Sequence, residues 1–117
     1  MRITNLTKNT TIAINAKVAK SFQDRLVGLL KHSALLQGEA LIITHCQQIH
    51  MFFMKFAIDA IFVSRKQKVV GIVENILPGH ISPIFFNANY CIELPVGSIA
   101  SSQTTVGDLL KNDPPFN

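Results

Sequence analysis

The sequence predicts a single, mainly β domain, either a β-sandwich or a partly closed barrel, with one short α-helix near the N-terminus. Short runs of β-branched and aromatic residues recur along the chain, and Pro, Gly or polar residues separate them. One segment near the N-terminus changes to helical spacing. Helices do not alternate with the β-prone runs, as a parallel α/β fold would require. A mainly β architecture is therefore expected.

The expected strands are short and follow one another along most of the chain. The first is a period-two alternation at residues 12–16, and the others are compact apolar runs bounded by turn residues. They are Ala40–Thr44, Ile49–Met54, Ile58–Ser64, Val69–Ile76 and Tyr90–Leu94. The small polar residues that follow, 98–105, are expected to be irregular or briefly helical.

The expected helix spans about Ser21 to Leu30. Four apolar residues at spacings of four, four and three would share one helical face, namely Val18, Phe22, Leu26 and Leu29. Ser21 followed by Asp24 resembles a capping box, although Glu or Gln is the more usual partner. This segment therefore predicts a short amphipathic helix.

The length of the chain sets its domain organisation. With 117 residues, 48% of them hydrophobic, it can bury one core but not two. We expect one β-rich domain over residues 1–111. The end of the chain, 112–117, carries two prolines and is expected to be a disordered tail.

No apolar stretch predicts a membrane span or a secretory signal. The apolar runs fall well short of the roughly 20 residues that a span needs, and the N-terminus has no continuous apolar segment. Cys46 and Cys91 are too few for a secreted disulfide scaffold, so both are expected to be core thiols. These features favour a soluble, cytoplasmic protein without a membrane partner, either a monomer or a weak dimer.

The formal net charge of +4 raises the question of nucleic-acid binding. Only Arg65, Lys66 and Lys68 cluster, and they lie between two apolar runs, where a solvated turn would carry charge. No recognisable DNA- or RNA-binding module surrounds them. A nucleic-acid partner is therefore not expected.

Three blocks of sequence together resemble a known family. The first contains Arg25, Gly28 and residues 38–43. The second is the run from Cys46 through 49–63, which includes His50-Met51-Phe52-Phe53-Met54-Lys55-Phe56-Ala57-Ile58-Asp59. The third contains 92–97 and Gly107-Asp108. In order and spacing, these blocks resemble the domain of unknown function 192 family of bacteria and archaea. The resemblance implies a β-rich domain, and it implies no particular reaction.

A metal site at His45, Cys46 and His50 is one hypothesis, since imidazole and thiolate bind zinc and copper. In an extended strand, residues four apart are separated by about 13 Å, which is too far for two ligands of one ion. We therefore predict no metal site and no cofactor.

A His50–Asp59 dyad is a second hypothesis, since a carboxylate can orient an imidazole for general-base chemistry. Pairing Met54 with Asp59 across a hairpin would leave His50 about 13 Å away. A hydrolase-type enzyme is therefore only a minor alternative, and we assign no catalytic residue.

The preferred hypothesis is a small-ligand-binding or accessory module. Binding pockets combine apolar walls with a few placed polar groups. The aromatic and Met residues of 51–56 could supply the wall, and His50, Lys55, Asp59 and Asp108 are the predicted ligand-binding residues. A protein-interaction or assembly module that uses a sheet edge or an apolar patch is the main alternative.

The last expectation is a structural ion pair between Arg25 and Glu93. Strand parity places Glu93 on a face that a small sandwich largely covers, and a buried carboxylate needs a cationic partner. Arg25 projects from the expected helix, and its guanidinium can bind a carboxylate through two hydrogen bonds.

Overall fold

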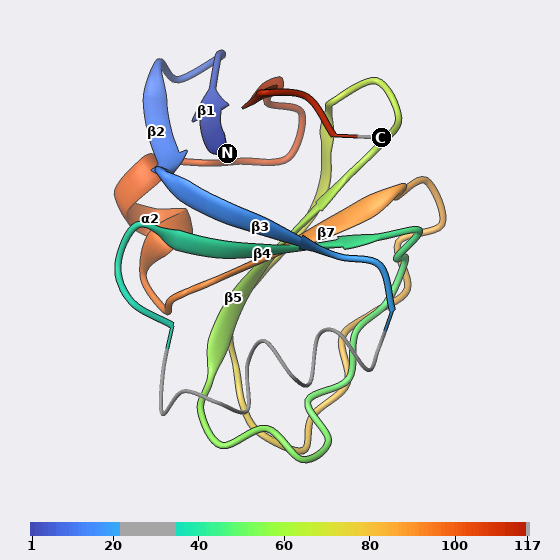
Figure 1. Ribbon diagram of the computed structural model, residues 1–117. Helices are drawn as coiled ribbons and strands as arrows, with labels where there is room; N and C mark the ends of the chain where they lie inside the picture. Colours follow the sequence, from blue (N-terminus) through green and yellow to red (C-terminus); the bar gives the residue numbers. More distant parts are fainter. Residues whose placement is uncertain (22–34, 117) are drawn as a thin grey trace.

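A computed structural model describes residues 1–21 and 35–116 of the chain. Within these residues eight strands and one helix are formed (Figure 1). In chain order they are β1 (Arg2–Asn5), β2 (Thr10–Ala13), β3 (Asn15–Ala19), β4 (Glu39–Thr44), β5 (Ile58–Val63), β6 (Val69–Ile76), β7 (Tyr90–Leu94), α2 (Ser98–Ser102) and β8 (Leu110–Asp113).

The strands form two sheets that do not close into a barrel. The smaller sheet has the order β2-β1-β8, and the larger has the order β3-β4-β7-β5-β6. The prediction of a mainly β fold is confirmed. The sequence leaves two architectures open, a β-sandwich and a partly closed barrel. The described strands form two separate sheets, so the prediction of a partly closed barrel is wrong.

The central strands of the larger sheet are buried on both faces. Every residue of β5 and of β7 is buried. On one face, Ile42, Ile61 and Ile92 pack with Ile3 and Leu110 of the smaller sheet. On the other face, among the described residues, side chains of the loops that precede β5 and β7 pack against the sheet. Strands buried on both faces read as apolar runs, which is why β4, β5 and β7 lie where the sequence predicts strands. β6, at the sheet edge, also lies where a strand is predicted.

The early strand expected at residues 12–16 is in fact two strands. The chain leaves the smaller sheet after β2 and enters the larger sheet at β3. Ile14 lies between the two and is 63% exposed. Its N–H and that of Asn15 both donate to the carbonyl of Gly38, at 2.9 and 3.0 Å. Alternation of apolar residues continues through this bend, so the pattern alone does not reveal it.

The strand expected at Ile49–Met54 is not formed, and this prediction is wrong. The N–H of Met54 donates to the carbonyl of Met51 at 3.2 Å, which closes a turn, and Phe53 has a φ of 68°. Only an isolated bridge joins His50 to Ile81. Apolar residues here serve partly as core and partly as exposed surface, so the run resembles a strand without being one.

The described helix, α2, lies near the C-terminus rather than the N-terminus. It occupies part of the segment expected to be irregular or briefly helical. The helix predicted for Ser21–Leu30 lies, apart from Ser21, outside the described residues. No helix of the described chain has the length and apolar character needed to cross a membrane.

The last strand extends past residue 111, where the sequence places the start of the tail. Asn112 and Asp113 belong to β8, which pairs with β1 in an antiparallel register that sets Asn112 opposite Ile3. Asn112 is buried. A short polar strand at a sheet edge lacks the apolar run that predicts strands, and its order comes from pairing with the N-terminal strand.

Candidate functional site

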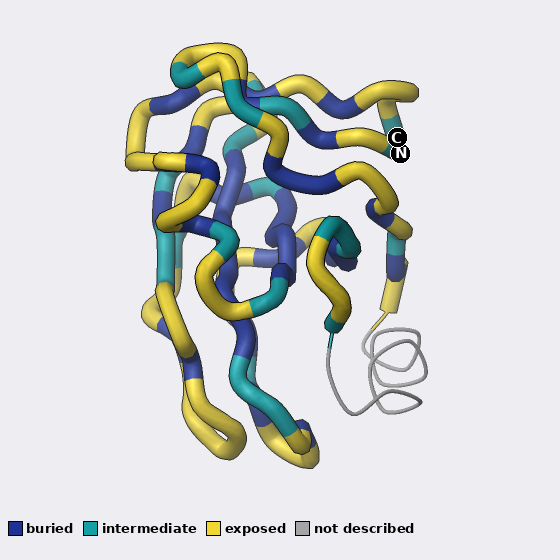
Figure 2. The backbone as a smooth tube through the Cα atoms, turned by 90° about the vertical axis from the view of Figure 1, so that its left-hand side faces the viewer, coloured by how far each residue is buried: buried dark blue, intermediate teal, exposed yellow. Residues whose placement is uncertain are grey.

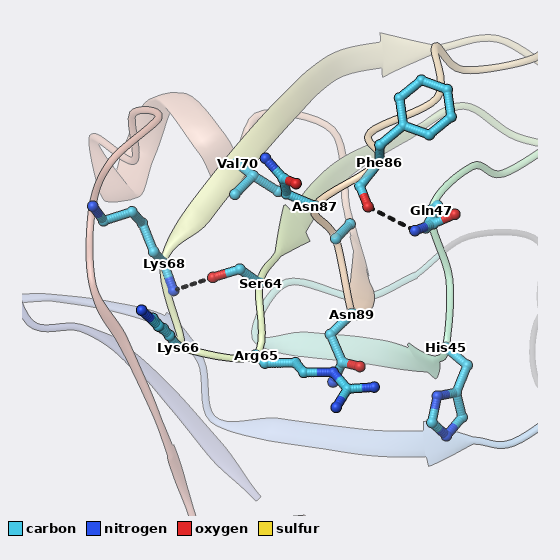
Figure 3. A pocket seen from close by; sticks show the side chains of 11 residues that line it. His45, Gln47, Ser64, Arg65, Lys66, Lys68, Val70, Phe86, Asn87 and Asn89 are labelled. Carbon is cyan, nitrogen blue, oxygen red and sulfur yellow. Dashed lines mark hydrogen bonds between the residues drawn. The ribbon is translucent and has the colours of Figure 1, made fainter.

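The C-terminal ends of β4 and β5 and the N-terminal end of β7 lie together at one end of the larger sheet. β7 runs antiparallel to β4 on one side and to β5 on the other, and Tyr90 at its start lies opposite both Thr44 and Val63. The residues that follow β4 and β5 therefore lie beside the residues that precede β7. A pocket of about 740 Å³ is found there. Its lining residues are His45, Gln47, Ser64, Arg65, Lys66, Lys68, Val70, Phe86, Asn87, Ala88 and Asn89 (Figure 3).

The lining of this basic pocket is positively charged. His45 follows β4, and Arg65, Lys66 and Lys68 belong to the turn between β5 and β6; all four are exposed. None of the lining residues is Asp or Glu. Within 1–21 and 35–116 the one ion pair joins Lys8 to Asp108. The pocket cations therefore keep their charge available to an anion.

Backbone hydrogen bonds shape the turn that carries these cations. The N–H of Gln67 donates to the carbonyl of Ser64 at 3.0 Å, and that of Ser64 donates to the carbonyl of Lys68 at 2.9 Å. Gln67 has a φ of 63°, in the left-handed region. This geometry puts Arg65 and Lys66 at the two central positions of the turn. Figure 3 shows the Arg65 side chain extending toward Asn89 and His45.

A chain of hydrogen bonds through the buried Tyr90 hydroxyl holds the turn in place. The hydroxyl of Tyr90 donates to Oε1 of Gln67 at 2.8 Å and accepts from Nδ2 of Asn112 at 3.1 Å. Burial raises the pKa of Tyr90 to about 12, against a smaller lowering effect of the two hydrogen bonds. The carbonyl of Gln67 also accepts from the N–H of Leu110 at 2.8 Å. The turn is therefore tied to both β7 and β8.

Amide side chains form the opposite wall. Asn87 and Asn89 precede β7, and the N–H of Asn89 donates to the carbonyl of Val63 at 2.7 Å. Nε2 of Gln47 donates to the carbonyl of Phe86 at 2.7 Å, which joins two segments of the wall (Figure 3). Side-chain amides can donate hydrogen bonds to an anion. The pocket thus combines cations with neutral donors.

The four predicted ligand-binding residues are held by different parts of the fold. Asp59 is 1% exposed. Its Oδ1 accepts from the N–H of Asn75 at 2.9 Å, and its Oδ2 accepts from the N–H groups of Gly97 and Ile99 at 3.1 and 3.0 Å. These bonds join β5 to β6 and to the start of α2. They support an architectural role for Asp59.

Asp108 is the centre of a second polar network, between the two ends of the chain. Its carboxylate accepts hydrogen bonds from Nδ2 of Asn5 at 2.9 Å, from Nζ of Lys8 at 2.8 Å and from the N–H of Thr105 at 2.9 Å. Burial by itself would raise the pKa of Asp108. The hydrogen bonds from Asn5, Lys8 and Thr105 outweigh this effect and hold the pKa well below its usual range.

His50 and Lys55 lie in the loop between β4 and β5. The His50 ring stacks on Phe52 with centroids 4.7 Å apart, and its Nδ1 accepts from the N–H of Phe52 at 3.4 Å. Lys55 is exposed. Among the described residues no hydrogen bond or ion pair joins either residue to Asp59 or Asp108. The structure therefore does not bring the four residues into one described contact network.

Glu93 is fully buried in β7, in register with Leu41 of β4 and Ala60 of β5. Its predicted partner, Arg25, lies outside the described residues. The ion pair between them stays a prediction.

The three residues of the metal hypothesis, His45, Cys46 and His50, all lie in the described part of the chain. No three His, Cys, Asp or Glu side chains come close enough to hold an ion in that part of the chain. Cys46 is buried, and its Sγ contacts the carbonyl of Gln48 at 3.3 Å. His45 instead lines the basic pocket.

Sequence reasoning found part of this pocket and missed the rest. The cluster of Arg65, Lys66 and Lys68 is visible in the sequence, where it indicates a solvated turn. His45 and the amides of Asn87 and Asn89 come from segments distant in the sequence. Only the antiparallel placement of β7 between β4 and β5 brings them together, and no local pattern signals it.

Comparisons with known proteins identify the fold. A family model described as "Uncharacterized ACR" (DUF192) matches residues 3–112. No curated protein matches the chain. A protein of unknown function from Novosphingobium aromaticivorans DSM 12444 is similar in structure, with a TM-score of 0.78 and 19% identity, over 95% of this chain and 82% of that one. A protein from Sinorhizobium meliloti 1021, provisionally named a transcription regulator, has a TM-score of 0.75 and 18% identity, over 94% and 89%. At this identity the likeness shows the fold alone.

Proposed function

Because the chain belongs to the domain of unknown function 192 family, whose description names no activity, we propose its function from geometry: it binds a small anionic ligand in the basic pocket. The observation that carries this proposal is that His45, Arg65, Lys66 and Lys68 all line one pocket, with no carboxylate among the lining residues. Phosphate and carboxylate groups are the anions that such side chains bind through charge-assisted hydrogen bonds.

The architecture of the pocket supports binding over simple solvation of a surface turn. A solvated turn needs no partner segment, whereas here Asn87 and Asn89 line the same pocket as the cations. The turn is also anchored through Gln67 to the buried hydroxyl of Tyr90. A preorganised site loses less conformational entropy when the ligand binds. Arg65 is at the centre of this arrangement, since a guanidinium can grip a phosphate or carboxylate with two parallel hydrogen bonds.

A catalytic function receives less support. Its predicted residues, His50 and Asp59, have separate partners in the described chain: His50 contacts Phe52, and Asp59 accepts three backbone hydrogen bonds. An interaction module is the stronger alternative, because several large apolar side chains are exposed at the opposite end of β5.

Titration with pyrophosphate tests the proposal. Amide chemical shifts of the ¹⁵N-labelled protein should move at residues 44–47, 64–68 and 86–89, and the dissociation constant should rise with added NaCl. Arg65→Gln and Lys68→Gln should each weaken binding about fivefold or more, equivalent to about 1 kcal/mol. Lys55→Gln is the matched control, because Lys55 is an exposed cation at the other end of β5.

Two results would contradict the proposal. One is the absence of shifts in the three segments at millimolar pyrophosphate. The other is an equal loss of affinity in Lys55→Gln, which would indicate a general charge effect in place of a site.

A further inference from the structure

Two loops lie side by side at the end of the molecule opposite the basic pocket. The N–H of Met51 donates to the carbonyl of His80 at 2.8 Å, and the carbonyl of Met51 accepts from the N–H of Gly79 at 2.8 Å. The bridge between His50 and Ile81 continues this contact. The loops 50–57 and 77–82 thus form one unit, seen at the bottom of Figure 1. Figure 2 shows that the ends of both loops are largely exposed.

This unit presents four large apolar side chains to solvent, which we call the apolar tip. Phe53 is 77% exposed, Ile81 55%, Leu77 46% and Phe52 42%. Their neighbours Met51 and Met54, at 0% and 6%, face the core. Exposed apolar side chains gathered at one place mark an interaction surface more often than single ones do.

The backbone is strained at Phe53, the most exposed ring of the apolar tip. Phe53 has a φ of 68°, which is unfavourable for a bulky side chain. A neighbouring ring contact, the stack of Phe52 on His50, fixes the second aromatic side chain. Strained positions of this kind often mark functional sites.

The two loops of the apolar tip carry basic side chains and no acidic ones. Lys55 and His80 are exposed in the two loops, and neither loop contains Asp or Glu. The exposed Glu74 of β6 is three residues before Leu77, about 10 Å back along the strand at 3.3 Å per residue. The tip therefore combines apolar side chains with basic ones.

We propose that the apolar tip docks on a lipid bilayer that carries anionic headgroups. Phe52, Phe53, Leu77 and Ile81 enter the boundary between headgroups and acyl chains, and Lys55 contacts the headgroups. Aromatic and apolar side chains flanked by basic ones are the composition that binds such surfaces. This is contact with one leaflet, and it departs from the expectation from sequence that the protein has no membrane partner.

Charge and shape favour a bilayer over a protein partner. A symmetric contact with a second copy would bring together two tips whose loops carry Lys55 and His80 and no acidic side chain to pair with them. A protein partner would need a pocket shaped to accept the side chains of two projecting loops. A fluid bilayer accepts them without a preformed pocket.

Vesicle flotation tests this proposal. The full chain should float with vesicles of 70% phosphatidylcholine and 30% phosphatidylglycerol, and much less with phosphatidylcholine alone. Phe53→Asn should reduce partitioning about tenfold, because a half-inserted ring contributes about 1.4 kcal/mol. Asn also suits a left-handed φ, so the variant should keep its fold, which thermal unfolding would verify. Lys55→Gln should reduce partitioning about fivefold.

Val106→Asn is the matched control, since Val106 is also a largely exposed apolar residue, at 61%, but lies in the turn before β8, outside both the apolar tip and the basic pocket. Its partitioning should equal that of the unaltered chain. Ile81→Ser provides a second removal of apolar surface from the tip and should also weaken flotation. The proposal is overturned if the unaltered chain does not float, if it floats equally with neutral vesicles, or if Val106→Asn loses as much as Phe53→Asn.

Discussion

Asp59 of β5 caps helix α2 from a neighbouring strand: its Oδ2 accepts a hydrogen bond from the N–H of Gly97 at 3.1 Å. Gly97 is the N-cap residue and has no side chain that could accept a hydrogen bond from the N–H groups of the first turn. The same oxygen accepts from the N–H of Ile99 at 3.0 Å. The first turn of α2 is thereby satisfied by a residue about forty positions earlier.

This relationship predicts that Asp59→Asn is strongly destabilising. An amide would set its N–H₂ against backbone N–H donors on one side, so at least one charge-assisted hydrogen bond is lost inside the core. The free energy of unfolding should fall by about 3 kcal/mol, as measured from urea midpoints. Asp113→Asn is the control, because Asp113 is exposed in β8, and its change should stay within about 0.5 kcal/mol. Similar small losses in both variants would contradict the capping role.

The low pKa of Asp108 predicts a dependence of stability on acid. Because its pKa in the folded chain lies below the unfolded value of about 3.9, the ionised carboxylate stabilises the fold above that pH. This contribution is lost as the pH falls toward the folded pKa. Asp108→Asn should therefore lower stability at pH 7 by about 2 kcal/mol and flatten the decline below about pH 4. Parallel curves for the two proteins between pH 2 and 7 would exclude this role.

Tyr90 can be titrated alone, since it is the single tyrosine and the chain has no tryptophan. Absorbance at 295 nm should show an ionisation midpoint at about 12 in the folded chain, and at about 10 in urea. Because the folded pKa is the higher one, stability should be lost as the pH rises above about 10. A folded midpoint near 10 would mean that the hydroxyl is not enclosed.

The hydroxyl of Tyr90 connects the core to the turn that carries the cations of the basic pocket. Tyr90→Phe leaves the side chains of Gln67 and Asn112 without this partner and should cost about 1–2 kcal/mol of stability. The turn at 64–68 should become more mobile. Its amide hydrogens should exchange faster than in the unaltered chain, and this increase should exceed the increase in β4. Unchanged exchange in the turn would separate Tyr90 from the positioning of Arg65.

Any side chain at position 71 would conflict with the ring of Phe85. A Cβ at this position would lie 2.2 Å from Cε1 of Phe85, whose ring packs on Phe62 with centroids 4.5 Å apart. Gly71→Ala should therefore cost about 1–3 kcal/mol. In a Phe85→Leu background the same change should cost much less, because the ring is gone. Equal costs in both backgrounds would rule out the conflict with Phe85 as the cause.

Some parts of this protein could be predicted from the sequence because their local pattern and their final burial agree. β4, β5 and β7 are short, mostly apolar runs, and both faces of these central strands are covered in the fold. The basic cluster at 65–68 lies between two of them, so its place in a turn follows from the pattern as well.

Other parts depend on contacts that no local pattern contains. β8 is ordered by pairing with β1 from the other end of the chain. The run at 49–54 resembles a strand, yet Met51 faces the core and Phe53 faces solvent because the loop pairs with residues 79–81. Asp59 and Asp108 stood out as candidate ligand-binding residues, and tertiary hydrogen bonds engage both within the fold.

The sequence by itself determined the family, the β-rich class and the location of the cationic turn, because these depend on residue types and on nearest-neighbour patterning. Only the tertiary structure decided that this turn faces His45, Asn87 and Asn89, and that Phe53 gathers with Leu77 and Ile81. Both arrangements come from strand order and direction. Antiparallel pairing around β7 sets the basic pocket at one end of β5, and the loop pairing of 51 with 79 and 80 forms the apolar tip at the other.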